Sequence, residues 1–227
     1  MSCTIEQWCT TLNEQFQVHA DAERARGASA YMRNHFPFMG IDTPTRRRIV
    51  RDVVQECGLP TAPLGCADRL WSMNEREFHY AACDLLTHRR VATALVPSDL
   101  PRLERLIVTK SWWDTVDVLA PSIIGGLLKP TPDLVRSTAE RWIASDNYWL
   151  QRSAILLQLK YREQTDAELL FWLITQRATS TEFFVRKASG WALRQYAYVA
   201  PDRVRAFVHD HTSLLSTLTV REATKHL

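Results

Sequence analysis

The sequence predicts an all-α protein built from stacked helical repeats. Only 7 glycines and 10 prolines occur in 227 residues, and Val, Ile and Thr do not alternate with polar residues over any long run, which disfavours a sheet protein. Five segments also share a local pattern that can be overlaid without gaps, and successive copies follow one another at steps of 35 or 36 residues. These copies are 77–82, 113–118, 149–154, 184–189 and 219–224.

A regular period without strand signals is typical of paired antiparallel helices of the tetratricopeptide or HEAT kind. No tetratricopeptide consensus is visible, so the pattern favours HEAT-like repeats. We therefore expect a superhelical array with a concave face, forming one domain over 1–227. Its irregular N-terminal cap covers about 1–60 and its regular repeats about 61–227.

Local signals predict where the helices begin and end. N-terminal caps are expected at Thr43 before Pro44, at Ser111, at the Ser145-Asp146 pair and at the Ser180-Thr181 pair, whereas Pro121 and Pro201 are expected to end helices. Ser111 with Asp114 three residues later fits a capping box, which gives Asp114 a structural role.

Composition excludes several classes of protein. The N-terminus lacks a basic region followed by an apolar one, and the apolar run 169–174 is far too short to span a bilayer, so we expect a soluble cytoplasmic protein. Five cysteines without a C-x-x-C pair argue against a disulfide framework and a zinc site. No H-E-x-x-H motif occurs, so metal chemistry is not expected. P-loop, G-x-G-x-x-G and G-x-S-x-G motifs are also missing, which excludes the usual nucleotide-binding proteins and hydrolases.

Asp117 is unusual within the repeat. The other four copies carry Ala or Ser at its position, and its neighbours Val116 and Val118 are apolar, so an unpaired carboxylate would be costly there if buried. Trp113 lies one helical turn earlier on the same face. This pairing suits a flat, cationic ligand, while the alternative is a core aspartate paired with an arginine.

Basic and aromatic residues recur together. The 28 basic residues comprise 23 arginines and 5 lysines. The spacing Trp-x-x-Arg occurs at Trp149 with Arg152 and at Trp191 with Arg194, and Lys187 lies one turn before Trp191. Such faces would line the concave surface and suit duplex DNA, whereas core tryptophans with arginines lying along them are the alternative. The helix carrying Arg46, Arg47, Arg48 and Arg51 is equally consistent with a solvated face or a phosphate contact.

Several segments closely resemble the AlkD-type DNA alkylpurine glycosylases of bacteria, which consist of HEAT-like repeats. The segments that carry the resemblance are 30–36, 107–114, 142–147, 149–152 and the pairs 190–191 and 193–194. The resemblance implies excision of cationic N3- and N7-alkylated purines, such as 3-methyladenine and 7-methylguanine, from duplex DNA in base excision repair. It further implies a monofunctional enzyme, acting as a monomer without base flipping, metal or organic cofactor.

Carried over to this sequence, the resemblance implies the catalytic residues Asp117, Trp113 and Trp191. It also implies DNA contacts by Arg152, Arg194, Lys160 and Tyr31, to which the shared helix face adds Lys187. Arg152 and Lys160 are expected on one side of the same helix. Because some relatives lack the carboxylate and bind DNA without cleaving it, a catalytically inactive DNA-binding protein is one alternative and a protein-binding scaffold is another.

Overall fold

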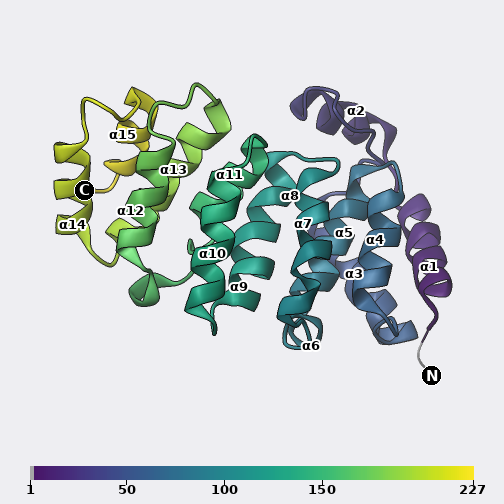
Figure 1. The fold of residues 1–227 in the computed structure, drawn as a ribbon. Coiled ribbons are helices and arrows are strands. Elements are labelled where there is room, and N and C mark those ends of the chain that lie inside the picture. The colour runs from purple at the N-terminus through teal and green to yellow at the C-terminus, as the bar shows by residue number, and fades with distance from the viewer. Residues whose placement is uncertain (1–2) are drawn as a thin grey trace. The chain divides into compact units, whose positions relative to one another are not determined.

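The computed structural model describes residues 3–227, which form helices and connecting loops without a strand (Figure 1). The predicted all-α class is therefore confirmed. The chain divides into two compact units, an N-terminal unit that ends at Leu95 and a C-terminal unit, Val96–Leu227. One continuous domain over 1–227, with a cap up to about residue 60, stays a prediction.

The N-terminal unit packs α3 and α4 against both α1 and α5. Trp8, Phe16 and Phe78 are almost fully buried in its core, where the rings of Phe16 and Phe78 lie 5.3 Å apart. The helices of this unit are α1 (Ile5–Val18), α2 (Ala22–Tyr31), α3 (Thr43–Cys57), α4 (Pro63–Ser72), α5 (Arg76–Thr87) and α6 (Arg89–Ala92).

A buried carboxylate fixes the loop between α2 and α3. Glu77 of α5 accepts hydrogen bonds from the backbone N–H groups of Met39, Gly40 and Ile41, at 3.0, 2.8 and 3.2 Å. Gly40 has a φ of 86°, and a Cβ there would lie 2.0 Å from the carbonyl oxygen of Asp21. Only glycine therefore fits this loop.

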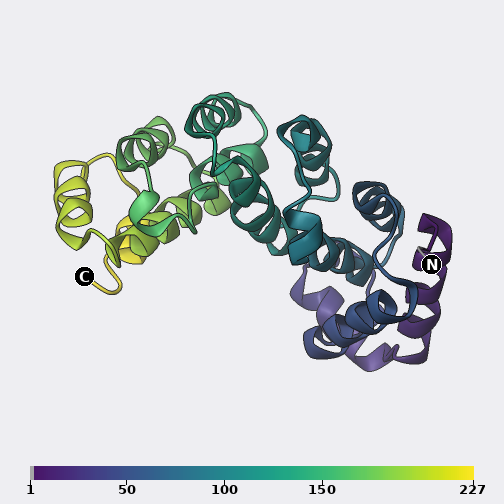
Figure 2. The same cartoon turned by 90° about the horizontal axis from the view of Figure 1, so that it is seen from below.

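In the C-terminal unit, α11 packs between α10 and α13, and α13 packs against α15. Figure 2 shows these helices in two rows, with α10, α12 and α14 in one row and α11, α13 and α15 in the other. The elements of this unit are the 3-10 helix η1 (Pro97–Asp99), α7 (Leu100–Val108), α8 (Trp113–Val118), the π-helical η2 (Leu119–Ile124), α9 (Gly125–Leu128), α10 (Pro132–Ile143), α11 (Tyr148–Leu156), the 3-10 helix η3 (Arg162–Gln164), α12 (Ala167–Gln176), α13 (Phe183–Ala197), α14 (Pro201–Asp210) and α15 (Thr217–Ala223).

The five copies of the sequence pattern fall on α5, α8, α11, α13 and α15, as the overlay predicts. The approach of α13 to α15 is close at Gly190. A Cβ at this position would lie 2.5 Å from Cβ of Glu222 and 2.8 Å from the carbonyl oxygen of Thr219. The glycine therefore permits α15 to lie directly against α13.

The predicted capping box at Ser111 is wrong. The Ser111 hydroxyl donates to the carbonyl oxygen of Ile107 at 2.6 Å, so it belongs to the end of α7, and α8 begins after Trp112 without a side-chain cap. Asp114 instead accepts from the N–H of Thr115 at 2.9 Å. Its structural role in the first turn of α8 remains.

Pro121 does not end a helix. It lies within η2, a π-helical turn through which the helix continues from α8 into α9. The wider turn accommodates the proline ring, which an α-helical turn would not.

The other predicted N-terminal caps are displaced by one or two residues. Asp42 caps α3 in place of Thr43, Asn147 caps α11 in place of the Ser145-Asp146 pair, and α13 begins at Phe183, after Glu182. Pro201 is the first residue of α14, beyond the end of α13 at Ala197.

Two further features concern the whole described range. Over residues 3–227 the five cysteines form no disulfide bond. In the same range, no helix combines the length and apolar character that crossing a lipid bilayer requires.

Candidate functional site

A cavity of about 240 Å³ opens in the C-terminal unit among α8, α11 and α13. All of the residues predicted for the site line it, except Lys160 and Tyr31. The lining residues are Trp113, Asp117, Arg152, Phe183, Phe184, Lys187, Trp191 and Arg194.

Asp117 and Arg152 form a bidentate ion pair inside this cavity. Nε and Nη2 of Arg152 each donate to one oxygen of Asp117 at 2.8 Å, and its Nη1 donates to the carbonyl oxygen of Phe184 at 2.6 Å. The Arg152 side chain is only 4% exposed and that of Asp117 is 18% exposed. Arg152 therefore links α8, α11 and α13, and the aspartate–arginine pair that the sequence left open lies within the candidate site.

The pKa of Asp117 is raised above its ordinary value, chiefly because burial disfavours the charged form. Arg152 opposes this effect through its hydrogen bonds and its charge, while the nearby charge of Asp114 adds to it. Burial thus favours the neutral form of Asp117, and Arg152 favours its ionised form. A perturbed carboxyl group in a cavity is a functional-site candidate.

The two adjacent indoles of α8 have different environments. Trp112 is buried and packs with Trp149 and Phe184, at ring distances of 5.7 and 5.1 Å, whereas Trp113 is half-buried and lines the cavity. Trp149 is therefore a core residue. This agrees with the alternative interpretation of the Trp149–Arg152 pair, a core tryptophan with an arginine beside it. Trp191, by contrast, is half-buried and reaches the cavity from α13.

Sequence reasoning missed Phe184. Its ring supports Trp112 and Trp149, and its carbonyl oxygen accepts from Arg152. The repeat carries a signal that could have found it, because Phe184 occupies the first position of its copy, as Trp113 and Trp149 do in theirs.

Sequence reasoning also missed Glu222 of α15, which holds two of the basic residues of the site. Its Oε1 lies 2.7 Å from Nζ of Lys187, and its Oε2 lies 2.6 Å from Nη1 of Arg194. Hydrogen bonds from these two cations lower the pKa of Glu222 to about 2. Glu222 is therefore ionised throughout the physiological range.

Two residues that the resemblance implies lie outside the cavity. Lys160 is exposed in the turn after α11, which ends at Leu156, so Arg152 and Lys160 do not share a helix as expected. Tyr31 is the last residue of α2 in the N-terminal unit, and its side chain is highly exposed.

The basic helix α3 has mixed surroundings. Arg46 is buried and its Nε donates to Asp84 at 2.9 Å, so it faces the protein interior. Arg47 and Arg48 are largely exposed, and Arg48 pairs with Asp52 one turn later at 3.2 Å. A solvated face therefore describes Arg47 and Arg48 but not Arg46.

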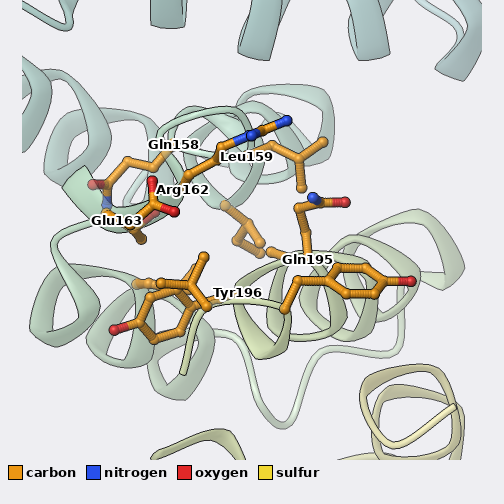
Figure 3. A pocket seen from close by; sticks show the side chains of 12 residues that line it. Gln158, Leu159, Arg162, Glu163, Gln195 and Tyr196 are labelled. Atoms are coloured by element: carbon orange, nitrogen blue, oxygen red, sulfur yellow. The ribbon is translucent and has the colours of Figure 1, made fainter. Parts of the chain in front are cut away.

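A second cavity of the C-terminal unit, of about 280 Å³, lies between the α11–η3 segment and α13 (Figure 3). Gln158, Arg162 and Tyr196 are among the side chains around it. The amide group of Gln158 is engaged by the backbone N–H and carbonyl of Asp166. None of the residues predicted for the site lines this cavity, whereas six of them line the cavity at Asp117, which is therefore the candidate site.

Comparison with known proteins identifies the family of the chain. A family model for the DNA alkylation repair enzymes matches residues 12–227. A solved structure described as a predicted DNA alkylation repair enzyme from Enterococcus faecalis shares 29% identity and a TM-score of 0.83, with 92% of this chain and 97% of that chain covered. No curated protein matches the chain. The family match spans nearly the whole length, and the chain belongs to the family of DNA alkylation repair enzymes.

Proposed function

We propose that this protein is a monofunctional DNA glycosylase. It hydrolyses the N-glycosidic bond of cationic N3- and N7-alkylated purines, such as 3-methyladenine and 7-methylguanine, in duplex DNA. Its family gives a role in DNA alkylation repair, and this proposal adds the reaction, the substrates and the residues.

The charge of the substrate explains how a single carboxylate can be enough for catalysis. Alkylation at N3 or N7 already gives the base a positive charge, so the leaving group needs no protonation and no general acid. Cleavage of the C1′–N bond leaves an oxocarbenium-like sugar, and a carboxylate can stabilise such a cation and orient the attacking water. We assign this role to Asp117.

The ion pair with Arg152 is the observation that carries the proposal. An ionised carboxylate has about four acceptor positions, of which Arg152 occupies one on each oxygen. The remaining positions can accept from a water molecule or meet the sugar through the exposed part of Asp117. Arg152 also counteracts the effect of burial on the Asp117 pKa, which favours the ionised form that this role requires.

The aromatic and basic residues complete the proposed site. Trp113 and Trp191 would pack against the deoxyribose, where their ring faces favour a developing cation. Lys187 and Arg194 would neutralise backbone phosphates, with further DNA contacts from Lys160 and Tyr31. Arg152, whose donors are engaged by Asp117 and Phe184, would act beside the DNA by holding Asp117 in place. The lesion need not be flipped into a pocket, since the reacting groups stand at an open cavity wall.

The direct test is release of 7-methylguanine from methylated duplex DNA under single-turnover conditions. Wild type should release the base, and Asp117→Asn should reduce the rate by at least about 100-fold, the lower end of what one preorganised electrostatic group contributes. Asp133→Asn makes the same chemical change at an exposed position of α10 and should leave the rate unchanged. Undiminished release by Asp117→Asn would contradict the mechanism.

A catalytically inactive DNA-binding protein is the second candidate. It is favoured by one observation, that both oxygens of Asp117 are already engaged by Arg152. Duplex binding by the wild type without release of any methylated purine would establish this function in place of the first.

A further inference from the structure

One register position of the repeat carries charge in three successive copies. Arg152, Lys187 and Glu222 each occupy the fourth position of their copy, 35 residues apart. Arg152 pairs with Asp117 of the preceding copy, and Glu222 pairs with Lys187 of the preceding copy. The charge at this position is therefore positive in the copies of Arg152 and Lys187 and negative in the last copy.

The reversal places an anion between two cations of the site. Glu222 bridges Lys187 and Arg194 with one carboxylate oxygen each, at 2.7 and 2.6 Å. Its side chain is 11% exposed, while Lys187 and Arg194 are 39% and 20% exposed. The anion therefore lies beneath the cations, and they keep access to solvent.

Lys187 and Arg194 lie on one face of α13, on either side of Trp191. Lys187 precedes Trp191 by one turn and Arg194 follows it by nearly one turn, and all three line the cavity. Lysine has three donors and arginine has five, so one ion pair each leaves donors for a second anion. Both cations remain able to bind phosphate while Glu222 holds them.

Backbone packing fixes the carboxylate in this place. Gly190 allows α15 to approach so closely that Cβ of Glu222 lies directly over the glycine. The carboxylate thus projects from the contact of α13 with α15, which gives its position little freedom.

We propose that Glu222 is a positioning residue for DNA binding. It fixes Lys187 and Arg194 beside Trp191 as a paired phosphate clamp next to the lesion, so that these long side chains are ordered before DNA arrives. This inference rests on the proposed function, because it assumes that DNA binds at the cavity of Asp117.

Two effects of removing Glu222 have opposite signs. Loss of a negative charge alone would strengthen attraction to DNA, because the net charge of the site rises by one. Loss of positioning would weaken binding, because the two cations become mobile. Glu222→Gln, which keeps the shape and removes the charge, separates the two effects.

The experiment measures the affinity of the full chain for undamaged duplex DNA at several salt concentrations. Glu222→Gln should bind about 3- to 10-fold more weakly, and the slope of log K against log salt should shrink by about 0.9 for each phosphate that the variant no longer neutralises. The matched control is Glu168→Gln, which makes the same charge change at an exposed ion pair with Arg203 and should not weaken binding. Equal or tighter binding by Glu222→Gln would overturn the proposal.

Two further experiments test whether Glu222→Gln weakens DNA binding only by disturbing the fold. Glu222→Asp keeps the charge but shortens the side chain, so it should also weaken binding, and it carries the test if Glu222→Gln does not fold. In a Lys187→Gln and Arg194→Gln background, Glu222→Gln should have no further effect on affinity. A further loss of similar size in that background would show that Glu222 acts through something other than the two cations.

The outcome is independent of the glycosylase assay. If wild type releases no methylated purine but Glu222→Gln still weakens duplex binding and reduces its salt slope, the proposed reaction fails and the clamp stands. If release is confirmed but binding is insensitive to Glu222→Gln, the clamp fails and the proposed reaction stands.

Discussion

The carboxylate of Asp117 and the guanidinium of Arg152 are joined by two hydrogen bonds of 2.8 Å, although the residues lie on different helices and 35 positions apart. This pair holds the carboxyl group of Asp117 at the wall of the cavity that Trp113 and Trp191 also line. The ionisation of Asp117 is therefore controlled by neighbours that can be changed one at a time.

Arg152→Gln should shift the acid limb of the pH–rate profile to higher pH. Arg152 lowers the pKa of Asp117, so its removal raises that pKa further, and the carboxylate becomes protonated at a higher pH. Single-turnover release of 7-methylguanine across the acid range, corrected for spontaneous depurination, measures the shift.

Asp114→Asn should move the same limb in the opposite direction. The charge of Asp114 raises the pKa of Asp117, so the neutral amide lowers it and activity extends to lower pH. An asparagine side chain can still accept from the N–H of Thr115. Shifts of the same sign in both variants would contradict the electrostatic account of Asp117.

Trp113→Ala should chiefly slow base release, whereas Trp112→Ala should chiefly lower the stability of the fold. Loss of Trp113 removes a ring face from the cavity, and we expect roughly 3- to 30-fold slower release with little change in stability. Loss of the buried Trp112 should lower the free energy of unfolding by about 3–5 kcal/mol. Denaturant unfolding and single-turnover rates on both variants check this contrast.

Gly190→Ala should destabilise the C-terminal unit by about 1–3 kcal/mol, because the added methyl group would overlap Glu222 and Thr219. The matched control is Gly126→Ala in α9, where nothing lies within 4 Å of the added Cβ. There the substitution should stabilise the helix by about 0.5–1 kcal/mol. Similar losses at both glycines, measured by denaturant unfolding, would refute the close packing of α13 on α15.

Glu222→Gln should lower the free energy of unfolding near neutral pH by an amount that disappears in acid. The pKa of Glu222 falls from 4.5 to about 2 in the folded chain, so its ion pairs stabilise the fold above the ordinary pKa of the group. That stabilisation is lost as the pH falls through the folded value. Denaturant unfolding of wild type and variant from pH 6 down to about pH 2 should show the difference narrowing.

The repeat register predicted much of the fold, and it pointed to one carboxylate that lines the candidate site. It placed five helices, and it singled out Asp117 as a charge where Ala or Ser is usual. Applied to every position rather than to one, it would also have pointed to Phe184 and to Glu222. Pairing partners such as Arg152 could be proposed but not chosen, because a sequence does not reveal which of 23 arginines reaches a given carboxylate.

The sequence signals for helix ends predicted the helix boundaries less well, because neighbouring helices compete for the same polar groups. Ser111 satisfies a carbonyl group of α7 in place of an N–H group of α8. Pro121 is tolerated because a π-helical turn makes room for its ring. The helix of Arg152 ends before Lys160, so a face inferred from helical spacing does not extend that far.

The three-helix contact of Arg152 limits which inactive forms of this protein can persist. A chain that lost only the carboxylate, by Asp117→Ala, would keep a buried guanidinium without its anion, at a cost of about 3–5 kcal/mol. That is a large part of the stability of an ordinary domain. Under the proposed function, we therefore expect a stable inactive form of this protein to have changed Arg152 together with Asp117, because loss of the carboxylate alone leaves the buried guanidinium without its anion.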